Sequence, residues 1–275
     1  MKGETRKLQT DVAIVGSGPG GASVAQGLAK QGKKVVILER GKHHRWTGNT
    51  LATLFMIDRQ SLLFPKDGAV RVGRALTTGG SSVIYCGTAV SPPNWIAEKY
   101  KIDLSEFVEA ARQEIGIKPL PDKLIGIASR RIMDAARDLG FNWNPVDKFI
   151  DAEKCDLKCP HCMLGCTMGA KWTARNYIHE AVNNGAVLLN QALVREVLFD
   201  NKQAVGVSVL TLRGQLTVEA KVTVLAAGGM ATPVLLQRAG IFDAGQGFYV
   251  DPLIVTYGEY NGPGSWRDIP MTAGT

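Results

Sequence analysis

Three glycines between an apolar run and a helix-compatible segment are the first residues with a chemical signature. They are Gly16, Gly18 and Gly21 in the sequence GSGPGG. The first glycine permits a tight turn, the second lets the backbone approach a pyrophosphate, and the third lets the helix pack close to the strand. A helix N-terminus also presents unpaired N–H groups and partial positive charge to phosphates. The spacing therefore predicts a dinucleotide-binding turn, to which Pro19 and Gly20 also belong.

The segments around this turn follow the order of a strand–helix–strand unit. Residues 12–15 are apolar, a helix-compatible segment continues to Lys30, and residues 35–38 form a second apolar run. Glu39 closes that run, where a carboxylate can accept hydrogen bonds from ribose hydroxyls, and Arg40 beside it is counted with the site. The alternative is a glycine-rich turn in another kind of α/β protein.

Four cysteines within twelve residues form the second chemical group. They are Cys155, Cys159, Cys162 and Cys166, spaced C-x3-C-x2-C-x3-C. Thiolates this close can wrap one metal centre, and soft sulfur ligands select an iron–sulfur cluster or zinc. Zinc sites usually consist of two C-x2-C pairs separated by a longer loop. The compact run therefore favours an iron–sulfur cluster, most simply [4Fe–4S], or [3Fe–4S] if one cysteine is not a ligand. Zinc, and free or disulfide-paired thiols, are the alternatives.

The other reactive residue types have simpler interpretations. Cys86 lies in an apolar segment without a neighbouring base, so we expect a buried small side chain rather than a nucleophile. His43 and His44 follow the ribose-binding strand and are expected to be exposed loop residues. His161 lies inside the cysteine run and could substitute as a ligand.

The composition is that of a globular protein with a substantial core. The chain has 275 residues, 45% hydrophobic and 21% charged, with a formal net charge of +7. No run reaches the roughly 18 uncharged apolar residues of a membrane span, and the polar segment 1–10 lacks the apolar core of a signal peptide. We therefore expect a cytoplasmic protein. The basic residues are dispersed and not interleaved with aromatic residues, so nucleic acid is not an expected partner.

Several further segments carry helix or loop signals. Residues 77–82 form a loop of small residues and hydroxyls that suits close approach to a phosphate or a flavin ring, with an ordinary loop as the alternative. Amphipathic helices are expected at 103–115, with Asp103 or Ser105 as the cap, and at 122–139. The remaining expected helices are at 51–64, over the nucleotide, at 173–184, and from 232 to 240.

Strand-like runs in the second half predict a β-meander that returns to a buried strand at 222–225. The runs are 186–190, 194–199, 204–212 and 215–218, with another at 251–260. A small-residue turn at 226–229 follows the buried strand and suits closing of the dinucleotide site. We therefore expect an α/β fold: a Rossmann-like domain over 1–245 whose parallel sheet continues into the meander.

Within that domain, residues 46–150 are expected to form a helical and loop insertion and residues 151–172 the cysteine segment. Residues 246–275 are expected to begin another domain.

Four blocks, taken together in order and spacing, resemble the glucose–methanol–choline (GMC) family of FAD-dependent oxidoreductases. The blocks are GSGPGGAS with Glu39, TTGGSSVIY, CPHCMLGCTMGAKWTARNYI with the meander after it, and VLAAGGMATPVLL. The resemblance covers the chain to about residue 245. The cysteine block is most similar to the branch with long-chain alcohol oxidases, and to sugar dehydrogenases with a cluster in the flavin subunit.

The resemblance implies FAD as the dinucleotide and assigns positions to it. Gly16, Gly18 and Gly21 would hold the pyrophosphate and Glu39 the ribose, while Val194 would meet the adenine through its backbone. The other positions assigned to the cofactor are Gly79, Gly80, Ser81, Ala227, Gly228 and Thr232.

Family enzymes are much longer than this sequence, and no catalytic residue is assigned here. Their second half builds the substrate-binding sheet and supplies a histidine, paired with histidine or asparagine, that takes the substrate hydroxyl proton. The resemblance therefore leads us to expect a substrate domain that is largely absent, 246–275 being its start, and a second subunit that supplies it with the base. A truncated form is the alternative.

The expected function is an FAD-dependent dehydrogenase acting on the CH–OH group of an alcohol. Hydride would go to the flavin, and electrons would pass to the iron–sulfur cluster and then to an acceptor protein or quinone. A cluster favours a dehydrogenase over an oxidase. The alternative is a non-catalytic FAD and iron–sulfur electron-transfer subunit of a larger complex.

Overall fold

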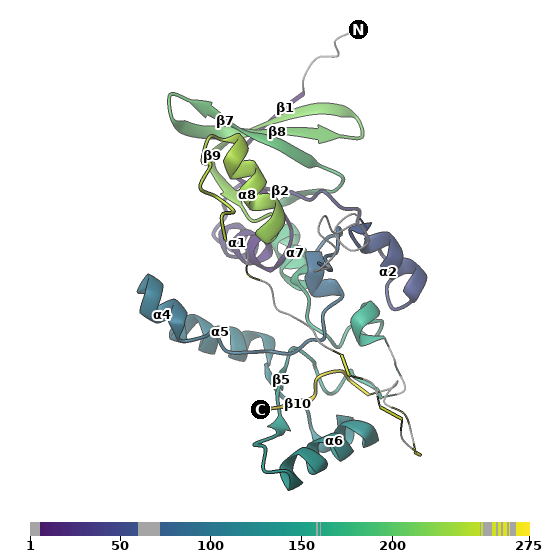
Figure 1. The fold of residues 1–275 in the computed structure, drawn as a ribbon. Helices are drawn as coiled ribbons and strands as arrows, with labels where there is room; N and C mark the ends of the chain where they lie inside the picture. The colour runs from purple at the N-terminus through teal and green to yellow at the C-terminus, as the bar shows by residue number, and fades with distance from the viewer. Residues whose placement is uncertain are drawn as a thin grey trace. The chain divides into compact units, whose positions relative to one another are not determined.

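The structure, a computed structural model, describes residues 6–59, 72–157, 159, 161–247, 249, 255–256, 258–259, 261–262, 264 and 268–275 (Figure 1). The chain forms two compact units. The first contains Met1–Trp46, Leu51–Val83 and Thr173–Ile254, and the second contains Thr47–Thr50, Ile84–Trp172 and Val255–Thr275. The first unit carries the predicted dinucleotide turn, and the second carries the four clustered cysteines. The domain boundaries drawn from the sequence stay predictions.

Six strands of the first unit form one mixed sheet in the order β6-β2-β1-β9-β8-β7. Strands β6, β2, β1 and β9 are parallel neighbours, whereas β9, β8 and β7 pair antiparallel. The bounds are β1 Arg6–Val15, β2 Val35–Leu38, β6 Val187–Leu189, β7 Leu193–Asp200, β8 Gln203–Thr211 and β9 Gly214–Leu225. The predicted α/β class, a parallel sheet that continues into a β-meander, is therefore confirmed.

The predicted strand–helix–strand unit is formed by β1, helix α1 (Pro19–Lys30) and β2. All four residues of β2 are buried, as expected for a central parallel strand that is covered on both faces. Helix α1 buries a row of mostly small residues: Gly21, Ala22, Ala25, Gln26 and Ala29. Because these side chains are short, the helix backbone can lie close to its neighbours.

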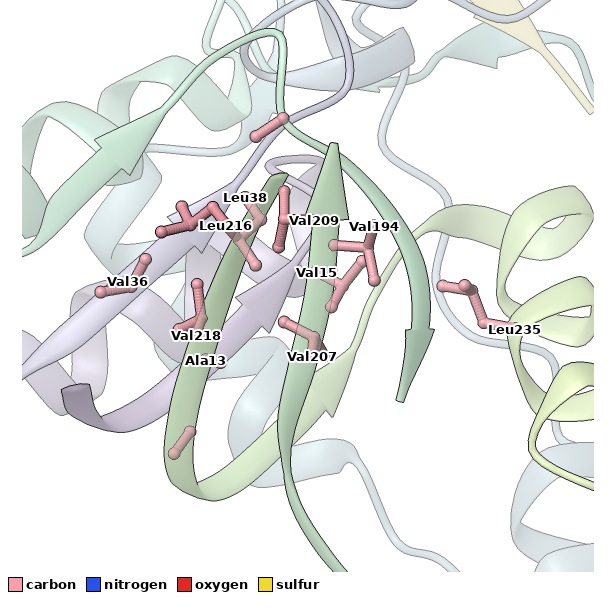
Figure 2. Packing of buried hydrophobic residues seen from close by; sticks show 12 residues of the cluster. Ala13, Val15, Val36, Leu38, Val194, Val207, Val209, Leu216, Val218 and Leu235 are labelled. Carbon is pink, nitrogen blue, oxygen red and sulfur yellow. The ribbon is translucent and has the colours of Figure 1, made fainter. Parts of the chain in front are cut away.

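The core of this unit lies on the sheet and is made largely of valine and leucine. Figure 2 shows Val36 and Leu38 of β2 and Val207 and Val209 of β8 within this cluster. Leu235 of helix α8 (Gly228–Arg238) belongs to the same cluster. β-Branched residues pack well on a pleated surface, which explains why valine is frequent in these strands.

Helix α7 (Ala174–Asn183) confirms the helix predicted at 173–184. It begins at Thr173 with a capping box, in which the Asn176 side chain accepts a hydrogen bond from the Thr173 N–H at 3.0 Å. Helix α8 begins at Gly228, earlier than the predicted Thr232. The Thr232 hydroxyl instead accepts the Ala227 N–H at 3.0 Å, which holds the start of the helix one turn upstream.

The second unit contains short helices around a smaller apolar core. Its elements are α4 Trp95–Tyr100, α5 Ser105–Ile115, α6 Ile127–Asp138, β3 Lys118–Pro119, β4 Asn144–Pro145, β5 Asp147–Lys148, β10 Ala273–Gly274 and the 3-10 turns η2 Asp122–Leu124 and η3 Cys162–Leu164. Leu120, Leu124, Ile150 and Ile269 belong to its buried core. Two further elements complete the described chain, α2 Thr50–Met56 and η1 Gly80–Val83.

Several predicted boundaries are corrected by long-range contacts. The helix predicted at 122–139 divides into η2 and α6, because the carboxylate of Asp268 accepts hydrogen bonds from the Ser129 N–H and hydroxyl at 2.7 and 2.8 Å and fixes the start of α6. The two strands predicted at 215–218 and 222–225 are one continuous strand, β9, paired with β1 along its length.

Two predicted elements reach outside the described residues. Helix α2 ends at Met56, and the rest of the helix predicted at 51–64 falls partly in 60–71, outside the described residues. Most of the strand predicted at 251–260 also lies outside them. None of the described helices is long and apolar enough to cross a bilayer.

Candidate functional site

The glycine turn after β1 is built on two contacts that exclude a side chain. Gly16 has φ of +103°, and a Cβ there would overlap the Ala226 carbonyl oxygen. The Gly16 N–H donates to the Leu38 carbonyl at 2.9 Å, which ties the turn to the end of β2. A Cβ on Gly21 would overlap the Gly16 carbonyl oxygen, so helix α1 can approach the turn only because this position is glycine.

Gly18 and Gly20 face open space instead. A Cβ at either position would meet no atom within 4 Å. Gly18 is the N-cap of α1, and neither a side-chain cap nor an acidic residue occupies the described first turn. The N-terminus of α1 therefore offers N–H donors and partial positive charge next to vacant backbone. These features fit a phosphate group.

Three glycine-bearing loops meet at this turn, as the sequence predicts. A Cβ on Gly80 would lie 3.2 Å from the Gly18 Cα, and the Gly79 N–H donates to the Ser17 hydroxyl at 3.1 Å. On the other side, the Ala226 N–H donates to the Val15 carbonyl at 2.9 Å. The turns at 77–82 and 226–229 are thus brought together with Gly16 and Gly18 by the tertiary structure.

Glu39 is buried, and its carboxylate holds the glycine turn. One oxygen accepts the Ser17 N–H at 3.1 Å and the Ser17 hydroxyl at 2.5 Å. The other oxygen accepts the Gly41 N–H at 2.7 Å. The oxygen that accepts the Gly41 N–H keeps a further lone pair, so ribose binding by Glu39 stays a prediction, and the structure adds a positioning role.

Ser17 is a residue of the candidate site that sequence reasoning missed. It is fully buried and joins Glu39 to the backbone of Gly79. Its place between two glycines of the turn was the available signal, but its partners lie 22 and 62 residues away.

The loop at 77–82 is anchored by its own hydroxyls. The Ser82 hydroxyl donates to the Gly79 carbonyl at 2.6 Å and accepts the Ala174 N–H at 2.9 Å. The Ser81 hydroxyl accepts the Ala75 N–H at 3.1 Å, while its residue is exposed. Thr78 is buried and its hydroxyl accepts a hydrogen bond from the Asn190 amide at 2.7 Å. The loop is therefore held rigidly on both sides.

Arg175 and His44 contact the same loop, and sequence reasoning did not assign Arg175 to the site. Arg175 of α7 donates from Nε to the Thr78 carbonyl at 2.8 Å and from a terminal nitrogen to the Thr77 hydroxyl at 3.0 Å. The His44 Nδ1 lies 3.1 Å from the same hydroxyl. His44 is therefore half-buried and bonded, not the exposed loop residue expected, whereas His43 is exposed.

Burial and the nearby positive charges shift the pKa values of Arg175 and the two histidines. Partial desolvation, and then the charge of Arg175, lowers the pKa of His44 and also that of His43, whose side chain stays largely open to solvent. Burial also lowers the pKa of Arg175. The neutral form of both histidines is thereby favoured beside the arginine.

The other residues assigned to the site lie as follows. Val194 points its side chain into the core of the sheet (Figure 2), and β7 is an edge strand of the sheet. Gly228 has φ of +80° and begins α8, and a Cβ there would meet no atom within 4 Å. Arg40 is exposed. The roles given to these residues stay predictions.

In the second unit, three of the four clustered cysteines pack against the apolar core. Cys155, Cys162 and Cys166 contact the cluster that contains Ile150. Burial raises the pKa of Cys162, and raises that of Cys155 to about 11, which favours neutral thiols. Cys159 lies with its Sγ 3.7 Å from the Thr167 hydroxyl.

The described residues contain no group of three or more Cys, His, Asp or Glu side chains arranged to hold a metal ion. The four cysteines are free thiols that do not form a ligand set as they stand. The structure therefore gives the predicted iron–sulfur cluster no support, and the ligand roles of Cys155, Cys159, Cys162 and Cys166 stay predictions.

Two buried lysines accompany the cysteine segment. Lys148 has no exposed surface, and its Nζ donates to the Cys86 and Pro270 carbonyls at 3.0 and 2.9 Å and to the Thr88 hydroxyl at 2.8 Å. Lys171 donates to the Cys162 carbonyl at 2.6 Å. Burial lowers the pKa of each ammonium group to about 8.

Known proteins similar to this chain agree with the geometry. The profile described as GMC oxidoreductase matches residues 20–250. An uncharacterised GMC-type oxidoreductase of Mycobacterium tuberculosis is 31% identical over 253 residues, which cover 85% of this chain and 39% of the relative. A long-chain-alcohol oxidase of Arabidopsis thaliana is 27% identical over 287 residues, covering 94% of this chain and 38% of the relative. The chain thus spans about two fifths of the length of these relatives.

A solved structure supports the fold. The crystal structure of pyridoxine 4-oxidase from Mesorbium loti superposes with a TM-score of 0.64 and 20% identity, covering 84% of this chain and 52% of that one. The family match supports FAD as the dinucleotide. With the glycine turn, the loop at 77–82 and the late turn placed together, the chain belongs to the GMC oxidoreductase family.

Proposed function

We propose that this chain is the FAD-binding part of an oxidoreductase that acts on the CH–OH group of an alcohol-type substrate. The observation that carries the proposal is the meeting of three glycine-bearing loops at the N-terminus of α1. Membership of the GMC family and similarity to a long-chain-alcohol oxidase support the substrate class.

The residues of the first unit would bind and orient the cofactor. The vacant backbone at Gly18 and Gly20 would receive the pyrophosphate at the positive end of α1. The Ser17–Glu39 contact would keep the N–H groups of the turn in place before binding, so that little ordering is needed. Bound FAD supplies a hydride acceptor for the substrate carbon.

The proposal includes a partner polypeptide with the substrate-binding region and the base that takes the hydroxyl proton. None of the four histidines, His43, His44, His161 and His179, is assigned to that step. An acceptor protein or a quinone would receive the electrons. The length of the relatives, of which the chain spans about two fifths, supports a contribution from outside these residues.

The test measures FAD binding first and turnover second. The purified chain is titrated with FAD, and alcohol-dependent reduction of a redox dye is assayed with and without the co-expressed product of a neighbouring gene. We expect a bound-flavin spectrum for the chain alone and turnover only with the partner. Absence of FAD binding overturns the proposed function, and turnover by the chain alone overturns the proposal that a partner polypeptide is needed. Oxygen consumption in place of dye reduction would indicate an oxidase rather than the expected dehydrogenase.

An iron–sulfur cluster at the four cysteines is a separate proposal, supported by their spacing alone. Protein purified without oxygen would be analysed for iron, acid-labile sulfide and zinc. About four iron and four sulfide per chain is the result expected of [4Fe–4S]. One zinc without sulfide, or free thiols without metal, contradicts it.

A further inference from the structure

Arg175 is a partly buried cation with no carboxylate partner among the residues that the structure describes. Its two hydrogen-bond acceptors, the Thr78 carbonyl and the Thr77 hydroxyl, are both neutral. Among the described residues, no carboxylate forms an ion pair with it, and burial alone accounts for its lowered pKa. A guanidinium has five N–H donors, of which these contacts use two. The guanidinium therefore has N–H donors and a positive charge that these contacts leave unmatched.

The local field makes this position more unfavourable for a cation. Arg175 is the second residue of α7, at the end of the helix that carries partial positive charge, and no acidic residue lies in that first turn. His43 and His44 lie near enough to feel its charge, and because their neutral form is favoured they supply no counter-charge. An anion bound here would offset both the buried charge of Arg175 and the partial positive charge at the start of α7.

The loop contacts place this cation beside the glycine turn. A Cβ on Gly79 would lie 2.8 Å from the Arg175 Cγ, so the arginine stem packs directly on the Gly79 backbone. Gly79 donates its N–H to Ser17, and the next residue, Gly80, lies against Gly18. Arg175 is thus one loop residue away from the vacant backbone that fits a phosphate.

Glu39 is the carboxylate of this turn, and among the described residues it forms no ion pair with Arg175. Its oxygens accept hydrogen bonds from Ser17 and Gly41. The guanidinium of Arg175 instead contacts the neutral Thr77 and Thr78, which leaves donors for a ligand.

We propose that Arg175 binds a phosphate oxygen of the dinucleotide pyrophosphate and that the loop at 77–79 presents its guanidinium to it. The inference rests on the proposed FAD-binding function and adds a residue to which neither the sequence pattern nor the family resemblance assigns a role. The fork of N–H donors matches a phosphate better than a lysine ammonium would.

The test compares three ligands that separate phosphate from flavin contacts. Calorimetric titrations of the full chain with FAD, ADP and riboflavin are repeated for Arg175→Gln and Arg175→Lys. We expect Arg175→Gln to weaken FAD and ADP by roughly ten- to a hundred-fold, the range for a hydrogen bond to a charged group, and riboflavin by less than about two-fold. Arg175→Lys should fall between the wild type and Arg175→Gln.

Arg213→Gln is the matched control, because it removes one positive charge from an exposed turn of the same unit. It should leave all three affinities within about two-fold. The 31P resonances of bound FAD should shift in Arg175→Lys. Because this variant keeps the positive charge, it still tests the contact if Arg175→Gln fails to fold. Unchanged ADP affinity and unchanged 31P shifts, or an equal loss for riboflavin, would overturn the role of Arg175. Failure of the wild-type chain to bind FAD overturns the proposed function instead.

Discussion

Gly21 and Gly27 lie in the same helix, and replacing each with alanine separates close packing from helix propensity. A Cβ on Gly21 would overlap the Gly16 carbonyl oxygen and lie 3.3 Å from the Ile14 Cγ2. A Cβ on Gly27 would meet no atom within 4 Å. Neither glycine has a positive φ, so neither substitution strains the backbone by itself.

The magnitudes follow from these contacts. Alanine in the interior of a helix is favoured over glycine by about 1 kcal/mol, so Gly27→Ala should stabilise the protein by up to that amount. Gly21→Ala gains the same propensity, but overpacking costs about 1–3 kcal/mol. The difference between the two variants therefore isolates the clash, and it should be about 1–3 kcal/mol in favour of Gly27→Ala.

Chemical denaturation of the FAD-free variants, followed by circular dichroism, measures this difference. Gly21→Ala should also weaken FAD binding, because the turn must move away from α1 to admit the methyl group. Gly20→Ala is a second comparison: the added methyl group enters open space, so it should not destabilise the FAD-free protein but should reduce FAD affinity. If Gly21→Ala is as stable as Gly27→Ala, the close approach of α1 to the turn is refuted.

The remaining predictions concern two buried polar links. Ser17→Ala removes a donor from the buried carboxylate of Glu39 and should destabilise the protein by about 1–3 kcal/mol in denaturant unfolding. The control Ser23→Ala, on the exposed side of α1, should lower the free energy of unfolding by less than about 0.5 kcal/mol. Equal losses in the two variants would contradict a stabilising Ser17–Glu39 hydrogen bond. Lys148→Met leaves four acceptors without their donor and should increase hydrogen exchange at 268–275, whereas the exposed control Lys154→Met should not. Unchanged exchange in Lys148→Met would show that the lysine does not hold this segment.

Local patterns were sufficient to predict the framework of the first unit. The apolar run at 35–38 coincides with β2, and the helix predicted at 173–184 differs from α7 by one residue at each end. The small-residue composition of 77–82 and 226–229 also indicated loops suited to the dinucleotide site, and the structure places both beside the glycine turn. Such patterns succeed because side-chain periodicity and turn chemistry are set by neighbours in sequence.

The boundaries that failed depend on partners far away in the chain. The start of α6 is fixed by Asp268, 139 residues after Ser129, and β9 runs continuously because β1 pairs with it from end to end. The spacing of the four cysteines predicts a metal centre; Cys155, Cys162 and Cys166 pack against the apolar core, and no metal-holding group is found among the described residues, so that prediction is without support and stays untested. Spacing limits which side chains can meet, whereas packing determines whether they do.

The sequence by itself determined the strand–turn–helix that begins the dinucleotide site and the family to which it belongs. Only the tertiary structure decided how that site is held and charged. Ser17 bridges Glu39 and Gly79, and Arg175 reaches a loop 98 residues earlier to bond Thr77. The physical reason is that a hydrogen bond or a cation without a counter-charge is a property of three-dimensional neighbours. No local pattern around Arg175 records which atoms surround it.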